Sequence, residues 1–163
     1  MPKSSIGHYV GTMPQLMGLA IDQLVQENTD YAVSLDPLAL DADKVTEMLC
    51  TTVPMSERRR QMSGVWLLLA SQSGADPEVA EVLHRLNASI VEGLTDLLRG
   101  MQQQGLLHPA RRVETEVHRL HALIDGMSLQ RMTDPELLSD ADVRAILRDE
   151  VGRLAEPTSA LVR

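Results

Sequence analysis

The side chains best suited to chemistry lie close together in one segment of the sequence. They are spaced at intervals of three or four residues, which would place two imidazoles and two carboxylates on one face of a helix. Zinc and similar ions accept both kinds of ligand. Paired histidines on a helix more often pack and form hydrogen bonds, so we predict no metal and no cofactor. The residues are Glu114, His118, His121 and Asp125.

Other signs of catalysis are weak. Cys50 is the one cysteine, which excludes an intramolecular disulfide and any multi-cysteine metal cluster and fits a reducing compartment. No local signature pairs Cys50 with a base, and the sequence contains neither a glycine-rich phosphate loop nor a serine elbow. We therefore predict a protein that is not an enzyme and that resides in the cytoplasm.

Charge and hydropathy exclude further classes. The chain has 15 Lys and Arg against 23 Asp and Glu, a net charge of -8, which argues against binding nucleic acid by charge alone. The longest wholly apolar run, Val65 to Ala70, is far shorter than the roughly 18 residues that span a bilayer. No apolar signal region follows Met1, so neither a membrane partner nor secretion is predicted.

The composition predicts an all-α fold. The chain has 163 residues, a length typical of one domain, and 44% hydrophobic residues with no Phe and one Trp. A core built without aromatic residues suits helices better than a sheet. Apolar residues recur at the helical period in six segments, and residues 65–70 are apolar on every side, which predicts a central position. The segments are 12 to about 30, 41 or 43 to 49, 56–74, 77–105, 111–132 and 139–154.

Local signals mark the helix ends and the last helix surface. Asp76 stands before Pro77, and Ser139 stands three residues before Asp142, both arrangements that cap a helix start. In the last segment, acidic and basic residues four positions apart predict ion pairs across a turn. These pairs are Asp140 with Arg144 and Asp149 with Arg153.

Several motifs together resemble a known family. The run LHALIDGMSL at residues 120–129 resembles the L-x-A-L-x-D-G-hydrophobic stretch of TetR-type bacterial transcriptional regulators, in the branch with a BetI-like C-terminal domain. Further features have similar spacing to those of that family: Trp66 before an apolar run, Asp76 to Glu78, Gly105 to Leu107 before Pro109, and Asp134 with Pro135 before the last helix. The resemblance implies a TetR-type C-terminal bundle.

The first residues resemble the end of the recognition helix of that family. Residues 1–11 are therefore interpreted as a remnant of a helix-turn-helix, and residues 12–163 as the ligand-binding and dimerisation domain. Most of the helix-turn-helix would lie before Met1, so operator DNA is expected as a partner only of a longer form. The remnant DNA-contact residues are Lys3, Ser4, Ser5, His8 and Tyr9.

The resemblance also implies a cavity for an unidentified small-molecule effector among the middle helices. Methionine suits adaptable apolar pockets, although methionines also fill cores in a chain without Phe. Trp66 could stack on a flat or cationic ligand, or pack structurally. The candidate ligand-binding residues are Met17, Met48, Met62, Trp66, Met101, His121 and Asp125.

The last two helices have wide apolar surfaces and are predicted to pair with those of a second copy in a four-helix interface. The function that follows is the ligand-sensing and dimerisation portion of a TetR-like regulator, most simply a repressor released from DNA by its effector. The alternatives are a stand-alone dimerisation partner without DNA binding and a small helical metal-binding protein. The predicted interface residues are Val117, Leu120, Ile124, Val143, Ile146, Leu147, Val151 and Leu154.

Overall fold

The computed structural model describes residues 18, 19, 23, 26 and 40–157, and within them it contains helices and no strand. The predicted all-α fold is confirmed. The first predicted helix lies largely outside the described residues, although Gly18, Leu19, Gln23 and Gln26 are helical. The remaining helices are α2 (Ala42–Cys50), α3 (Glu57–Gln72), α4 (Pro77–Gln103), α5 (Val113–Thr133) and α6 (Asp140–Ala155).

The predicted caps set the helix boundaries. Asp76 accepts hydrogen bonds from the backbone N–H groups of Glu78 and Val79 at the start of α4, and Ser139 with Asp142 forms a complete capping box on α6. Each cap satisfies donors that have no partner inside the helix. Gly105, just after α4, has a φ of +73°, a left-handed conformation that favours glycine and ends the helix.

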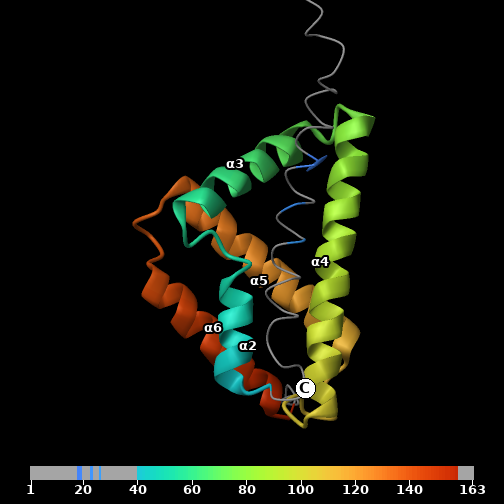
Figure 1. Cartoon of the computed structure of the whole chain (residues 1–163), viewed down its shortest axis with the longest axis vertical. Coiled ribbons are helices and arrows are strands. Elements are labelled where there is room, and N and C mark those ends of the chain that lie inside the picture. The colour runs from blue at the N-terminus through green and yellow to red at the C-terminus, as the bar shows by residue number, and fades with distance from the viewer. Residues whose placement is uncertain (1–17, 20–22, 24–25, 27–39, 158–163) are drawn as a thin grey trace, which may run out of the picture.

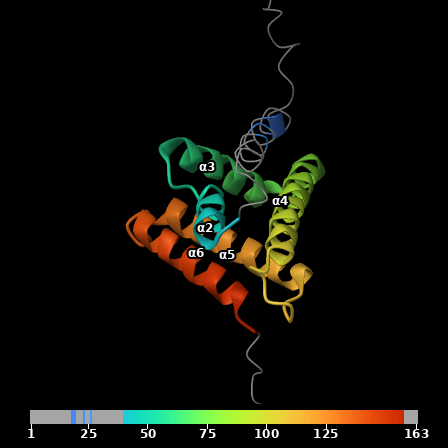
Figure 2. The ribbon, with the colours of Figure 1, turned by 60° about the horizontal axis from the view of Figure 1, so that its bottom comes forward.

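Three helices form a triangle, and two more close one side of the molecule. α3, α4 and α5 contact one another pairwise, while α2 packs on α6 (Figure 1). α5 and α6 run side by side at one edge of the bundle (Figure 2). None of the described helices has a stretch both long enough and apolar enough to cross a bilayer.

The buried side chains of the described residues fall into two separate clusters. The main cluster joins α2, the second half of α4, α5 and α6. The second is small and joins α3 to the first half of α4 through Leu69, Val79, Val82 and Leu83. Because the two clusters do not merge, the middle of the triangle has no continuous apolar core among the described residues.

The prediction of a central second half for α3 is wrong. Leu69 is the only buried residue of α3, and Leu68 is 47% exposed. α3 forms one side of the triangle, and its main described contacts are with α5 at one end and α4 at the other. Residues 65–70 are therefore apolar on every side of α3 although α3 is not buried on every side.

Arg131 ties two chain connections together. Its buried guanidinium donates from Nε to the carbonyl of Pro54 at 3.2 Å and from Nη1 to the carbonyl of Leu138 at 2.6 Å, and it also pairs with Asp140. These bonds join the α2–α3 connection to the α5–α6 connection. A buried arginine with each contact satisfied stabilises one relative placement of both connections.

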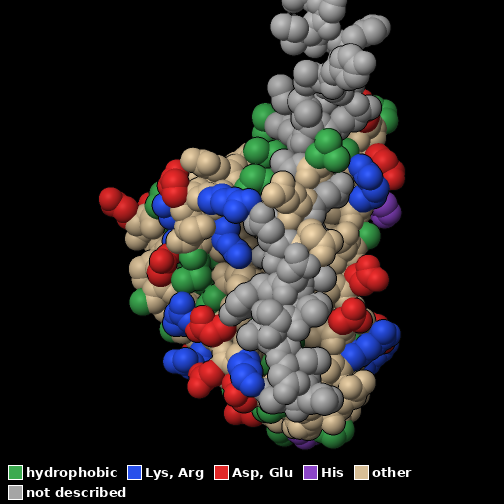
Figure 3. Space-filling view, in the orientation of Figure 1, with side chains coloured by type: hydrophobic (Ala, Val, Ile, Leu, Met, Phe, Trp, Pro, Cys, Tyr) green, Lys and Arg blue, Asp and Glu red, His purple; other side chains and the backbone are tan. Residues whose placement is uncertain are grey.

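The two ion pairs predicted within α6 are wrong, because both arginines pair with other carboxylates and Asp140 pairs with Arg131 of α5. Arg144 pairs with Glu47 of α2. Arg153 pairs with Glu116 of α5 and with Glu150, both at 2.5 Å. Figure 3 shows the resulting mixture of acidic and basic side chains over α2 and α6.

Two adjacent leucines provide a test of the core assignment. Leu138 is 7% exposed in the main cluster, whereas its neighbour Leu137 is 63% exposed. We expect Leu138→Ala to lower the free energy of unfolding by about 2–5 kcal/mol and Leu137→Ala to change it by about 0.5 kcal/mol or less. Chemical denaturation of both variants measures this, and equal losses would contradict the described packing.

Candidate functional site

His121 and Asp125 form a polar pair in the middle of α5. The Nε2 atom of His121 lies 3.6 Å from Oδ2 of Asp125, one helical turn away. Ser128 and Met132 continue the same side of α5 at helical spacing. This side faces α3, because the Cε atom of Met132 lies 3.4 Å from where a Cβ on Gly64 would stand. The structure thus brings together two of the predicted ligand-binding residues on the side of α5 toward the triangle.

The His121 imidazole is incompletely bonded. Its side chain is 14% exposed, and Nε2 is buried without any hydrogen-bond partner in the structure. The 3.6 Å separation from Asp125 is too long for a hydrogen bond. A buried polar atom left unpaired costs about 1–3 kcal/mol, so such atoms are rare and are often explained by a ligand or a water.

Asp125 is also poorly compensated. Its side chain is 43% exposed, and burial raises the pKa of this carboxyl, an effect that the charge of His121 only partly opposes. Among the described residues, His121 is the one ion-pair partner of Asp125. The carboxylate therefore lacks the arginine or lysine that normally accompanies a partly buried negative charge.

Glu116, nine residues before Asp125 on α5, shows the contrasting arrangement. Its side chain is 5% exposed and lies 3.0 Å from Nη1 of Arg111 and 2.5 Å from Nη2 of Arg153. Burial alone would raise the pKa of Glu116, but hydrogen bonds from Arg153 and Arg111 outweigh it and lower the pKa. This network is structural, and sequence reasoning missed it because Glu116 and Arg153 lie 37 residues apart.

The predicted methionines do not form one group. Met101 is 0% exposed in the main cluster, so its assignment to a ligand surface is wrong and it is a core residue. Met48 and Met62 are partly buried on α2 and α3, and Met17 lies outside the described residues. Trp66 is partly buried and packs against the second cluster.

The described residues supply no cluster of three or more His, Cys, Asp or Glu side chains that could hold a metal ion. His118 is exposed, and it therefore does not share the environment of His121. Cys50 is buried, and burial raises the pKa of its thiol despite the charge of Arg148. A raised thiol pKa makes a poor nucleophile at neutral pH.

Most of the predicted dimer-interface residues lie inside the protomer. Seven of them are between 0% and 5% exposed in the main cluster, because the apolar side of each helix covers the core of its own chain. They are not available to a second copy, and this assignment is corrected. Ile146 is only partly buried, and the DNA-contact residues from Lys3 to Tyr9 lie outside the described residues. The seven are Val117, Leu120, Ile124, Val143, Leu147, Val151 and Leu154.

The outer sides of α5 and α6 are rich in small side chains. Ala122 and Gly126 on α5 and Ala145 and Gly152 on α6 are exposed, and a Cβ added at either glycine would meet nothing within 4 Å. Leu129 on the same side of α5 is 43% exposed. The sequence offered a signal for this surface, since these residues follow helical spacing opposite the apolar side.

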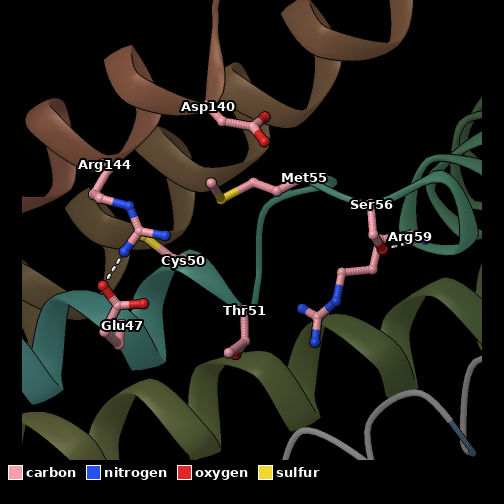
Figure 4. A pocket seen from close by; sticks show the side chains of 8 residues that line it. All are labelled: Glu47, Cys50, Thr51, Met55, Ser56, Arg59, Asp140 and Arg144. Atoms are coloured by element: carbon pink, nitrogen blue, oxygen red, sulfur yellow. Dashed lines mark hydrogen bonds and ion pairs between the residues drawn. The ribbon is translucent and has the colours of Figure 1, made fainter.

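A separate hollow of about 330 Å³ lies between the end of α2 and the starts of α3 and α6 (Figure 4). None of the predicted ligand-binding residues lines it. Arg144 is paired with Glu47 across it, and Asp140 is paired with Arg131, so these charges are already compensated. The lining residues are Glu47, Cys50, Thr51, Met55, Ser56, Arg59, Asp140 and Arg144.

Comparison with known sequences identifies related proteins. Residues 41–156 match the family model for the C-terminal domain of BetI-type transcriptional repressors. The chain is also 24% identical over 149 residues to the HTH-type transcriptional regulator PksA of Bacillus subtilis, which covers 90% of this chain and 71% of PksA. The sequence match spans α2 to α6.

Solved structures share the fold. A transcriptional regulator from Rhodococcus sp. Rha1 has a TM-score of 0.71 at 20% identity, over 91% of this chain and 76% of that one. A protein described as a transcriptional regulator from Saccharomonospora viridis, solved in complex with choline, has a TM-score of 0.71 at 22% identity, over 85% of this chain and 72% of that one.

Neutralising the two carboxylates of α5 should change stability in opposite directions. Asp125→Asn removes a charge that burial disfavours, so we expect the melting temperature at pH 7 to stay the same or rise. Glu116→Gln leaves the buried Arg111 without its charged partner and should cost about 3–5 kcal/mol of unfolding free energy. Thermal and denaturant unfolding measure both. A large loss for Asp125→Asn would contradict the described difference.

The pH dependence of the Glu116 contribution has a defined sign. Because its pKa is lowered in the folded chain from about 4.5, its stabilisation is present above that value and is lost as pH falls through the folded pKa. The unsubstituted protein should therefore lose more unfolding free energy than Glu116→Gln does as pH is lowered below 4.5. Parallel acid-unfolding curves of the two proteins would contradict this.

Proposed function

Because this chain belongs to the TetR family of transcriptional regulators, with residues 41–156 forming a BetI-type C-terminal domain, we propose that it is the effector-sensing and dimerisation part of such a regulator. It acts as a regulator and not as an enzyme, in the cytoplasm, where Cys50 remains reduced. Its effector controls how a helix-turn-helix reader meets operator DNA, most simply by releasing a repressor.

The His121–Asp125 pair supports an effector site on the side of α5 that faces α3. This pair leaves a buried nitrogen unpaired. This unpaired atom is the observation that carries the proposal. The choline bound by the related protein from Saccharomonospora viridis supports a small organic molecule as effector.

Effector control requires a difference in affinity between two helix arrangements. An effector shifts the population only by the ratio of its affinities for the released and the DNA-competent states. α3 contacts α5 at one end and α4 at the other, and little of it is buried. A ligand on the α3 side of α5 would therefore act on the helix that, among α2 to α6, buries the fewest residues.

The outer sides of α5 and α6 support a homodimer. The ion pair between Arg153 and Glu116 at one end, and that between Arg131 and Asp140 at the other, hold the two helices antiparallel. Small residues on their outer sides allow the backbones of a second copy to approach closely, and exposed Leu129 adds apolar area. The proposed interface is this outer surface of α5 and α6, and not their buried residues.

Two matched alanines test the interface. We expect the chain to sediment as a dimer at about 10 µM, and Ala122→Glu to yield monomers because it places a charge in the apolar contact. Ala88 of α4 is also exposed but lies outside the proposed interface. Ala88→Glu is therefore the control and should remain dimeric. A dimer that survives Ala122→Glu, or that both variants dissociate, would contradict the proposed interface.

A ligand screen tests effector sensing. We expect at least one small molecule in a set that includes choline to raise the melting temperature, by roughly 5–10 °C at 100 times its Kd. The single tryptophan, Trp66, provides a fluorescence signal for the same titration. If no compound of a broad library changes the melting temperature or the Trp66 fluorescence, the proposed effector sensing is wrong.

A further inference from the structure

The outer sides of α5 and α6 each carry an exposed charge among their small side chains. On α5 an arginine stands three and seven residues before two small residues, and on α6 an aspartate lies between two small residues at similar spacing. Residues spaced in this way share one side of a helix. A second copy that covers the small residues therefore also covers both charges. The residues are Arg119, Ala122 and Gly126 on α5, and Ala145, Asp149 and Gly152 on α6.

The Arg119 charge is in excess on its own protomer. Its side chain is 55% exposed, and its Nε atom lies 3.5 Å from a carboxylate oxygen of Glu116. That carboxylate already accepts hydrogen bonds from Arg111 and Arg153, so a third arginine adds little to its compensation. The guanidinium of Arg119 therefore has N–H donors that can bind a second carboxylate.

Asp149 lacks a cation where Arg119 lacks a carboxylate. Its side chain is exposed, and Arg153, four residues later, pairs with Glu116 and Glu150. Within the described part of the chain, the Asp149 carboxylate has neither an ion-pair nor a hydrogen-bond partner. Water stabilises such a charge on a free surface, but a contact that excludes water makes it costly. A dimer formed through this surface must therefore supply a cation to Asp149.

Arg119 and Asp149 lie at nearly the same level along the pair of helices. The ion pair between Glu116 and Arg153 fixes the register of the antiparallel α5 and α6. Arg119 is three residues after Glu116, and Asp149 is four residues before Arg153. Because the helices run in opposite directions, both steps lead the same way, by roughly 4.5 Å and roughly 6 Å at the standard rise.

We propose that Arg119 of each protomer pairs with Asp149 of the partner subunit, so that α5 of one copy lies against α6 of the other. This inference rests on the proposed dimer and specifies its arrangement. A twofold axis parallel to the helices places α5 opposite the partner's α6 and keeps every residue at its own level. The interface then contains the same ion pair twice, and both charges are compensated.

The other symmetric arrangement is electrostatically less favourable. A twofold axis perpendicular to the helices, within the plane of the contact, places α5 against α5 and α6 against α6. Asp142, seven residues before Asp149, is exposed on the same side of α6, so this arrangement places one acidic surface against its own copy. Like charges that face one another across an interface lower the affinity. The charges on the outer surface therefore favour the arrangement in which α5 meets α6.

Two charge reversals on separate chains test the ion pair. Arg119→Glu places two carboxylates together and Asp149→Arg places two guanidinium groups together, so each variant alone should dimerise at least about tenfold more weakly than the unsubstituted chain. An equal mixture of the two variants should form a heterodimer, because both of its contacts then join opposite charges. Sedimentation over a dilution series measures the affinities, and native mass spectrometry identifies the heterodimer.

Matched reversals on another helix are the controls. Glu92→Arg and Arg99→Glu change exposed charges of α4 and should leave the dimer as it is, while the melting temperature of each variant reports its folding. Single variants that dimerise as tightly as the unsubstituted chain would overturn the ion pair. A mixture that stays monomeric would also overturn it, and is the result expected if the two residues pair within one chain.

The same measurements separate the ion pair from the dimer itself. If the unsubstituted chain is a dimer and Ala122→Glu dissociates it, the proposed interface stands even where the charge reversals give a contrary result. If the unsubstituted chain is a monomer, both proposals fail.

Discussion

The structure depends on how the charged side chains at the two ends of α5 are paired. Glu116 near its start is buried between Arg111 and Arg153, and Arg131 near its end is buried against Pro54, Leu138 and Asp140. An unpaired buried charge costs several kcal/mol, so these contacts strongly restrict the neighbours of α5. They fix α6 antiparallel beside it and hold the α2–α3 connection at its far end.

The charged and polar side chains in the middle of α5 are less completely paired than those at its ends. Between the two satisfied ends lie His121 and Asp125, which the chain leaves only partly compensated. A protein whose other buried charges are carefully paired retains such a pair at a cost in stability. The same helix therefore carries fully paired charges at its ends and an incompletely paired His121 and Asp125 in its middle. This contrast supports a ligand site at His121 and Asp125 more strongly than the presence of a histidine and an aspartate alone.

Sequence reasoning succeeded where the controlling interactions are local. The start of α4 at Asp76, the capping box of Ser139 with Asp142 and the helical period of each described helix depend on residues within one or two turns. It failed where partners are distant. Arg144 pairs with Glu47 and Arg153 with Glu116, and not with the predicted neighbours on α6. The apolar sides of α5 and α6 pack on the core of their own chain. Periodicity identifies the buried side of a helix but cannot tell whether its own chain or a second copy buries it.

The candidate site likewise could be predicted in part from local spacing, while the rest depends on contacts between helices. Helical spacing placed His121 and Asp125 on one side of α5, but the spacing also included His118 and Glu114, which are exposed. The packing of α5 against its neighbours, α3 beside Met132 among them, decides which of these side chains face inward. Among helices α2 to α6, α3 buries a single residue, so we expect its position to change more easily than that of the helices in the main cluster. An effector bound on the α3 side of α5 would therefore affect α3 before the firmly paired ends of α5, and a change in the placement of α3 is the step by which we expect binding to be transmitted.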